Sequence, residues 1–125
     1  MAGPKWANDL MMDAALDYVA GATEMRVCSA TDATPTRPEV VTAALTGAIT
    51  MAGGDYTKAD GTTSGRKTTV SAKSGVSVTA SGNAENIALS DATNLRYVTT
   101  CTLQALTSGN TVNVPAWAIE VADPT

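Results

Sequence analysis

The stretch GRKTTVSAKSGVSVTASGNAENIAL, residues 65–89, decides the fold class of this 125-residue chain. It consists of short segments rich in threonine and valine, which favour β-strands, separated by serine–glycine pairs, which mark turns. Strands are therefore predicted at 67–71, 76–80 and 85–89, with turns at Ser74-Gly75 and at Ser81-Gly82-Asn83.

The same pattern continues on both sides of this stretch. Further strands are predicted at 24–30, 56–59, 95–102 and 111–121, and further turns at 60–61, 64–65 and 108–110. Pro115 cannot donate a ladder hydrogen bond, so it places the last strand at an edge or at a bulge. Several short strands at this spacing predict a mainly β fold, an antiparallel β-sandwich or small barrel of the jelly-roll or Ig-like kind.

One helix is predicted before the strands, at residues 8–20. Asn8 or Asp9 can cap it and Gly21 ends it. Asp9, Asp13 and Asp17 recur every four residues, which predicts one solvated acidic stripe along the helix. The opposite side carries the apolar residues Met11, Met12, Ala15, Leu16, Tyr18 and Val19. The chain is thus predicted to divide into an N-terminal arm with an amphipathic helix, 1–22, and a β domain, 23–125.

The sequence gives less definite predictions for two segments between the expected elements and for two short motifs. Residues 31–38 are predicted to form a loop, and 40–51 fit either a helix or a strand. Residues 55–64 have a superficial likeness to a calcium-binding loop, but they lack its bidentate glutamate, which favours a simple hairpin connection. Residues 63–67 can offer backbone amides and two cations to an anion, although a turn leading into a strand explains them as well.

Composition excludes several classes of function. The chain contains no histidine, so mechanisms and metal sites that need an imidazole are excluded. Only 16% of the residues are charged and the net charge is −4, without lysine or arginine clusters, which argues against nucleic-acid binding. We therefore expect no enzyme, no catalytic residue, no metal and no cofactor. Cys28 and Cys101 are expected to be buried reduced thiols, with one disulfide as the alternative.

No segment fits a leader or a membrane span. Residues 1–6 include Lys5 but no apolar run, and the helix carries Asp13 and Asp17. Synthesis and folding in a cytoplasm, without membrane contact, are therefore expected.

The supply of large apolar residues is small, which points to burial in an assembly. Leucine, isoleucine and valine together number 21, and phenylalanine is absent. A core this thin often gains further burial in an oligomer. Trp6 either fills the core or anchors the arm on a neighbouring subunit, and the apolar helix side packs either on the β domain or on a partner. The candidate interface residues are Trp6, Leu10, Met11, Met12 and Tyr18.

Several motifs resemble a family of small virion structural proteins of tailed bacteriophages and prophages. They are Trp6-Ala7-Asn8-Asp9 with residues 11–16 and Tyr18, then 63–67 with Thr69-Val70, then 97–101, Gln104 and 106–112, and finally Pro115, Trp117, 119–121 and Asp123-Pro124. The likeness covers most of the chain and weakens between about Thr31 and Gly54.

The resemblance implies a non-enzymatic virion protein, made in the bacterial host and located on the head surface. The first role that the resemblance implies is that of a capsid decoration or cement protein. Such a protein would bind the major capsid protein or other virion proteins and would form a homo-oligomer such as a trimer. The alternatives are a head-fibre base or a tail-associated protein. A carbohydrate-binding module for host attachment, in which Trp117 or Tyr56 would stack on sugar, is a further alternative.

Overall fold

The computed structural model describes residues 6–124 and is mainly β, with 46% strand, 18% helix and antiparallel sheets. The predicted fold class, a mainly β antiparallel fold with an N-terminal helix, is confirmed. The helices are α1 (Asp9–Ala20) and α2 (Arg37–Ala43), with a 3₁₀ turn at Gly53–Asp55. The strands are β1 (Glu24–Cys28), β2 (Ile49–Thr50), β3 (Tyr56–Asp60), β4 (Arg66–Val70), β5 (Lys73–Ser77), β6 (Gly82–Ser90), β7 (Leu95–Leu106), β8 (Thr111–Val114) and β9 (Trp117–Val121).

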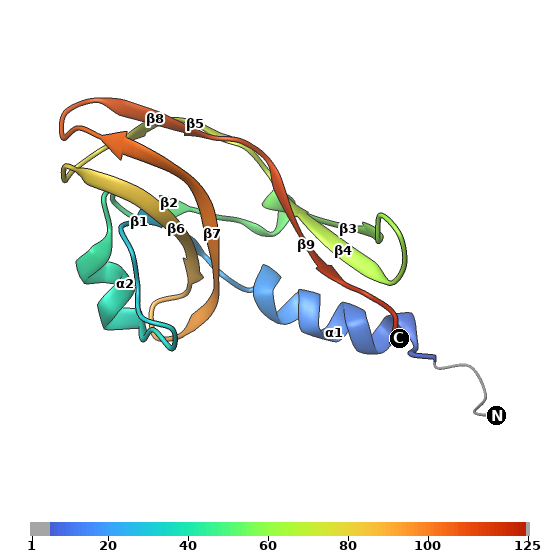
Figure 1. Ribbon diagram of the computed structural model, residues 1–125. Coiled ribbons are helices and arrows are strands. Elements are labelled where there is room, and N and C mark those ends of the chain that lie inside the picture. Colours follow the sequence, from blue (N-terminus) through green and yellow to red (C-terminus); the bar gives the residue numbers. More distant parts are fainter. Residues whose placement is uncertain (1–5, 125) are drawn as a thin grey trace.

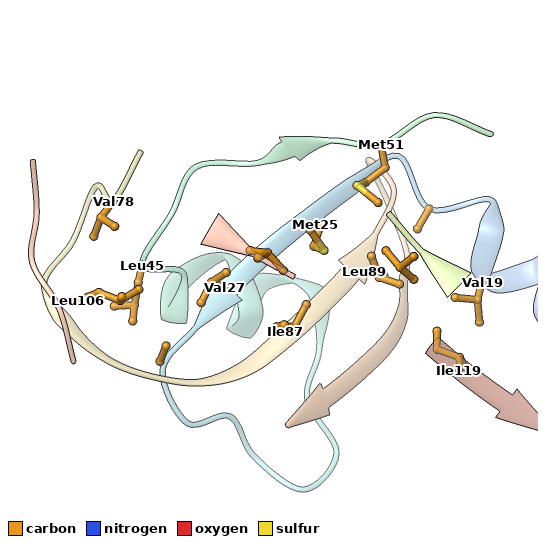
Figure 2. Close-up of a cluster of buried hydrophobic side chains, with 14 of the residues drawn as sticks. Val19, Met25, Val27, Leu45, Met51, Val78, Ile87, Leu89, Leu106 and Ile119 are labelled. Carbon is orange, nitrogen blue, oxygen red and sulfur yellow. The ribbon is translucent and has the colours of Figure 1, made fainter. Parts of the chain in front are cut away.

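The strands form two layers with the core between them. One layer is the sheet β2-β1-β6-β7; the other consists of β3-β4-β9 and β5-β8, which are linked because β4 leads into β5 and β8 into β9 (Figure 1). Val27 and Ile87 from the first layer belong to the same buried cluster as Val114 and Ile119 from the second. Figure 2 shows much of this cluster. The architecture is a small β-sandwich.

Helix α1 lies beside β3 and β4 and contributes to the same core (Figure 1). Met12, Leu16 and Val19 are buried, and the last two belong to the main cluster. The helix therefore shares its core with the β domain. Residues 1–5 of the predicted arm lie outside the described residues.

A second helix, α2, corrects the end of the loop predicted over 31–38, because residues 37 and 38 are already helical. Both alternatives left open for 40–51 occur, since residues 40–43 belong to α2 and Ile49–Thr50 forms β2. Thr36 caps α2 by accepting a hydrogen bond from the Glu39 amide, and Pro38 lies in its first turn, where no intrahelical N–H is required. Val40 packs with Cys28 and Ala88 on the outer face of the large sheet. This covers β1 on both faces, which explains why four of its five residues are buried.

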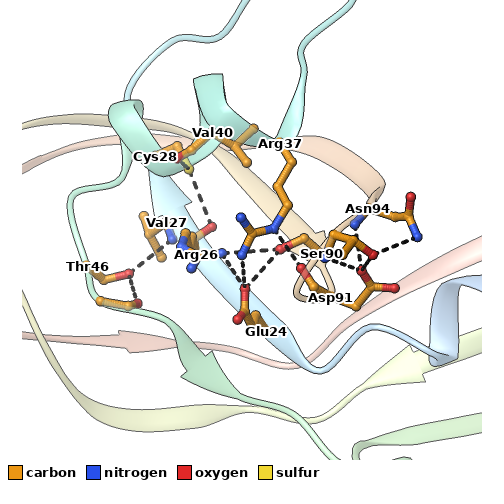
Figure 3. A network of polar contacts seen from close by, with 12 residues as sticks. Glu24, Arg26, Val27, Cys28, Arg37, Val40, Thr46, Ser90, Asp91 and Asn94 are labelled. Carbon is orange, nitrogen blue, oxygen red and sulfur yellow. Dashed lines mark hydrogen bonds and ion pairs between the residues drawn. The ribbon is translucent and has the colours of Figure 1, made fainter.

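A polar network beneath α2 fixes this helix to the sheet (Figure 3). Arg26 is only 8% exposed, and its Nη1 donates to Glu24 Oε2 at 2.8 Å and to Ser90 Oγ at 3.2 Å. Arg37 of α2 reaches Glu24 Oε2 at 3.3 Å and the Asp91 carbonyl at 2.7 Å. The Arg26 hydrogen bond, assisted by the charges of both arginines, lowers the pKa of Glu24. The buried arginine is thus paired, as a buried charge must be.

Four further local predictions can be compared with the structure. The turn predicted at Ser74-Gly75 is wrong, because both residues lie within β5. Residues 55–64 form part of the expected hairpin, since β3 pairs with β4 from Tyr56↔Val70 to Asp60↔Arg66. The predicted strand 111–121 is interrupted at Pro115, between β8 and β9. The turn predicted at 81–83 is wrong, because Gly82 already begins β6, where Leu45 Cδ2 would lie 3.0 Å from a Cβ.

Candidate docking surface

Four of the six large hydrophobic side chains that are exposed in residues 6–124 lie on or just before α1. Trp6 and Leu10 are each 76% exposed, Met11 is 63% exposed and Tyr18 is 53% exposed. We call these four residues the arm surface. The other two exposed residues, Val41 and Leu103, lie on α2 and β7. Single exposed apolar residues are common on soluble proteins, whereas a group of four on and just before one helix makes this surface the candidate for docking.

Met12 does not belong with the other interface candidates. It is 1% exposed and lies on the buried side of α1, near Leu16. The prediction that Met12 is an interface residue is therefore wrong. Neighbouring positions on a helix point about 100° apart, so Met11 faces outward while Met12 faces inward. Packing on the β domain is thus confirmed for the buried side of the helix, whereas packing of the exposed side on a partner stays a prediction.

Charged side chains hold α1 against the hairpin of β3 and β4. Asp13 Oδ1 accepts from Arg66 Nε at 2.9 Å, and Asp17 Oδ1 lies 2.8 Å from Lys58 Nζ. The prediction of a solvated acidic stripe is corrected at Asp13, whose side chain is 17% exposed, whereas Asp17 pairs with Lys58 while remaining 59% exposed. Hydrogen bonds to Asp13 and to Asp60 raise the pKa of Arg66. Arg66, one of the two cations of the anion-binding alternative, is therefore already paired.

The start of the helix is fixed by a cap. The Asn8 side chain accepts a hydrogen bond from the Leu10 amide at 2.8 Å, as expected for the first residue of a capped helix. The cap sets the backbone direction between Trp6 and Leu10, which are the two most exposed members of the arm surface.

Tyr18, at the other end of the helix, is held by Arg96 of β7. The guanidinium carbon lies 4.4 Å from the centre of the Tyr18 ring, and Arg96 Nη1 donates to the Tyr18 carbonyl at 2.6 Å. Asp91 Oδ2 in turn accepts from Arg96 Nη2 at 2.7 Å. Hydrogen bonds from the amides of Asn94 and Thr93, and then from Arg96, lower the pKa of Asp91. Tyr18 therefore presents an exposed ring whose position is fixed.

The members of the arm surface were predictable from the sequence, but the residues that hold them in position were not. Arg96 is 78 positions from Tyr18, and no periodicity or motif connects the two. The partners of Asp13 and Asp17 lie on β3 and β4, and the four-residue spacing of the aspartates gives no information on what faces them.

The aromatic residues considered for sugar stacking are packed against the core. The Tyr56 hydroxyl donates to the Ala22 carbonyl at 2.9 Å, and burial raises the pKa of Tyr56 to about 12. The Trp117 ring stacks on Tyr97 with ring centres 6.1 Å apart and both pack against the main cluster. Neither Tyr56 nor Trp117 forms an isolated exposed platform.

Both cysteines are free thiols in the structure, as expected from their spacing in the sequence. Cys28 is fully buried, and desolvation raises its pKa to about 11. Cys101 is half-buried on β7, and desolvation raises its pKa as well. A raised pKa keeps both sulfurs protonated near neutral pH, which lowers their nucleophilicity.

Two features are absent from residues 6–124. No group of three or more acidic or cysteine side chains is placed to hold a metal ion. None of the helices has the length and apolar character needed to cross a bilayer.

No family model, curated protein or solved structure matches this chain. The resemblance to phage virion proteins therefore rests on the sequence motifs and stays a prediction.

Proposed function

We propose that this chain is a non-enzymatic head decoration protein of a tailed bacteriophage, which stabilises the capsid by binding the major capsid protein. The observation that carries the proposal is the arm surface, because it presents four large apolar side chains on a helix whose opposite side is fixed in the core. The sequence motifs described above supply the expected setting, a phage particle.

The chemistry of the arm surface suits a permanent protein contact. Tryptophan and tyrosine are enriched among the residues that dominate binding energy, and methionine adapts to irregular partner surfaces. Trp6 and Tyr18 supply these rings, and Met11 lies between them along the chain. The aspartates of the helix that pair with Lys58 and Arg66 are directed to the β hairpin, so the exposed apolar residues need no charged partner.

The first test is the number of copies on the particle. Purified virions should carry this chain in hundreds of copies, measured by quantitative mass spectrometry against the major capsid protein. Tens of copies or fewer, at the tail or at one vertex, would favour the head-fibre or tail-associated alternative. Absence from virions would overturn the proposal.

The second test asks whether the arm surface makes the contact. Trp6→Ala should weaken binding to assembled shells of the major capsid protein by about 2 kcal/mol, or about thirtyfold. Val41→Ala on α2 is the matched control, because Val41 is also exposed but lies outside the arm surface, and it should bind as the parent does. Equal binding by Trp6→Ala and the parent would remove the arm surface from the interface. The proposal would then lose the observation that carries it.

A further inference from the structure

A second feature, formed by strands and not by α1, is a groove of about 710 Å³ between β7 and the β8–β9 ribbon. Thr100 and Thr102 line it from β7, Asn113 and Val114 from β8, and Trp117 and Ala118 from β9. β7 lies beside the β8–β9 ribbon (Figure 1), and the rings of Tyr97 and Trp117 stack between the two.

Of the five strands that line the groove, β7, β8 and β9 are edge strands, whereas β1 and β6, which contribute Val27, Ala84 and Ile87, are interior strands of the large sheet. β7 ends the sheet β2-β1-β6-β7, β9 ends β3-β4-β9, and β8 ends β5-β8. Within residues 6–124, no backbone hydrogen bond joins β7 to β8 or β9. An edge strand presents a row of unpaired N–H and C=O groups, which is the template for adding another strand. Here two such edges face the same groove.

The residues that line the groove determine what kind of peptide segment could bind in it. None of the residues that line the groove, all within the described part of the chain, is charged. The lining combines aliphatic side chains with threonines, one asparagine and one glutamine. Trp117 Nε1 is buried and has no hydrogen-bond partner among the described residues, so it lacks an acceptor. A charged segment would lose its hydration here without compensation, whereas an uncharged one would not.

The volume sets the length of such a segment. One strand residue occupies about 3.3 Å along the strand, 4.8 Å between strands and 10 Å between sheets, or about 160 Å³. A groove of about 710 Å³ therefore holds about four residues of extended chain.

We propose that this groove binds one extended, uncharged segment of a partner protein, about four residues long and alternating between small polar and β-branched side chains, which adds as a strand to β7 or to the β8–β9 edge. The contact is independent of the arm surface, so it stands whether or not the proposed function is correct. Main-chain hydrogen bonds supply the affinity, and the uncharged lining supplies the selectivity.

The test uses the full chain and a synthetic probe. The probe is a capped peptide with five alternating threonine and valine residues and one lysine at each end for solubility. Its control is the same peptide with the central valine replaced by proline, which removes an N–H and fixes φ. Amide chemical shifts of the ¹⁵N-labelled protein should change saturably at β7, β8 and β9 with the first peptide and not with the second.

Two protein variants form the second arm. Ala118→Arg places a charge in the groove and should weaken peptide binding by about tenfold or more. Ala116→Arg is the matched control, because Ala116 is an exposed alanine two residues earlier that does not line the groove, and it should bind as the parent does. Both variants should unfold at the parent temperature by circular dichroism.

Three outcomes would overturn the inference. They are no saturable shift with the alternating peptide, equal binding of the proline peptide, and equal binding by Ala118→Arg and the parent. If the chain instead self-associates in light scattering, and only Ala118→Arg abolishes this, then a second copy fills the groove and the assignment to a partner protein is wrong.

Discussion

One side of α1 lies in the core and the other side is exposed. The same substitution should therefore change the stability of the chain very differently at two positions of this helix. Leu16→Ala removes a side chain that is 1% exposed and belongs to the main cluster, whereas Leu10→Ala removes one that is 76% exposed. The chemical change is identical and alanine is a good helix former at both sites, so the difference reports packing alone.

The expected cost of Leu16→Ala follows from its burial. Truncating a buried leucine loses transfer free energy and leaves a cavity, which together cost about 2–5 kcal/mol. A domain of this size is stable by about 5–15 kcal/mol, so the loss is a large fraction of the total. At about 4 °C per kcal/mol, the melting temperature should fall by about 8–20 °C. Leu10→Ala should change the free energy of unfolding by less than about 0.5 kcal/mol.

The measurement is urea unfolding of the parent and both variants, followed by far-ultraviolet circular dichroism. Equal slopes with shifted midpoints would identify a change in stability alone. The reasoning is refuted if Leu16→Ala costs less than about 1 kcal/mol, because α1 would then be a detachable arm. It is equally refuted if Leu10→Ala destabilises the chain as much as Leu16→Ala does.

Three further predictions concern polar groups. The pKa values of Glu24 and Asp91 are lowered in the folded chain, so their stabilisation is present above their unfolded-state pKa and is lost as the pH falls through the acid range. The free energy of unfolding should therefore be lower at about pH 3 than at about pH 7, and an unchanged value would contradict this assignment. Tyr56→Phe removes the hydrogen bond to the Ala22 carbonyl and should cost about 1 kcal/mol in urea unfolding, and no cost would show that this bond adds nothing. Thr68→Val removes a buried hydroxyl that has no partner among the described residues and should stabilise the chain by about 1 kcal/mol in the same assay; a loss of stability would mean that the hydroxyl is satisfied.

The strands were predictable because their signals are local. Threonine- and valine-rich segments and glycine turns gave the approximate places of β3, β4, β6 and β7, and the cap and stop of α1 were correct. Helix α2 was only partly predictable: the composition of 40–51 fits a helix or a strand, and Pro38 suggested a loop, although proline is tolerated in a first helical turn. Which strands pair, and where sheets end, depends on contacts distant in sequence and was not accessible.

The arm surface was likewise partly predictable from the sequence, whereas the groove was not. Leu10, Met11 and Tyr18 could be selected from the helical pattern, but the pattern did not show which side of α1 faces the core, so Met12 was included wrongly. The groove depends on β7, β8 and β9 all being edge strands, a property of sheet order that strand propensity does not contain.

The arm surface follows from how α1 distributes its side chains. An amphipathic helix usually places charged residues outward, opposite its buried stripe. In α1, Asp13 and Asp17 instead point along the flank toward β4 and β3, where they pair with Arg66 and Lys58. The outward side is thereby left to Leu10, Met11 and Tyr18. A group of large exposed apolar side chains of this kind suits contact with a second surface. The position of these two aspartates thus explains why the outward side of α1 is apolar, which is the observation on which the proposed partner contact rests.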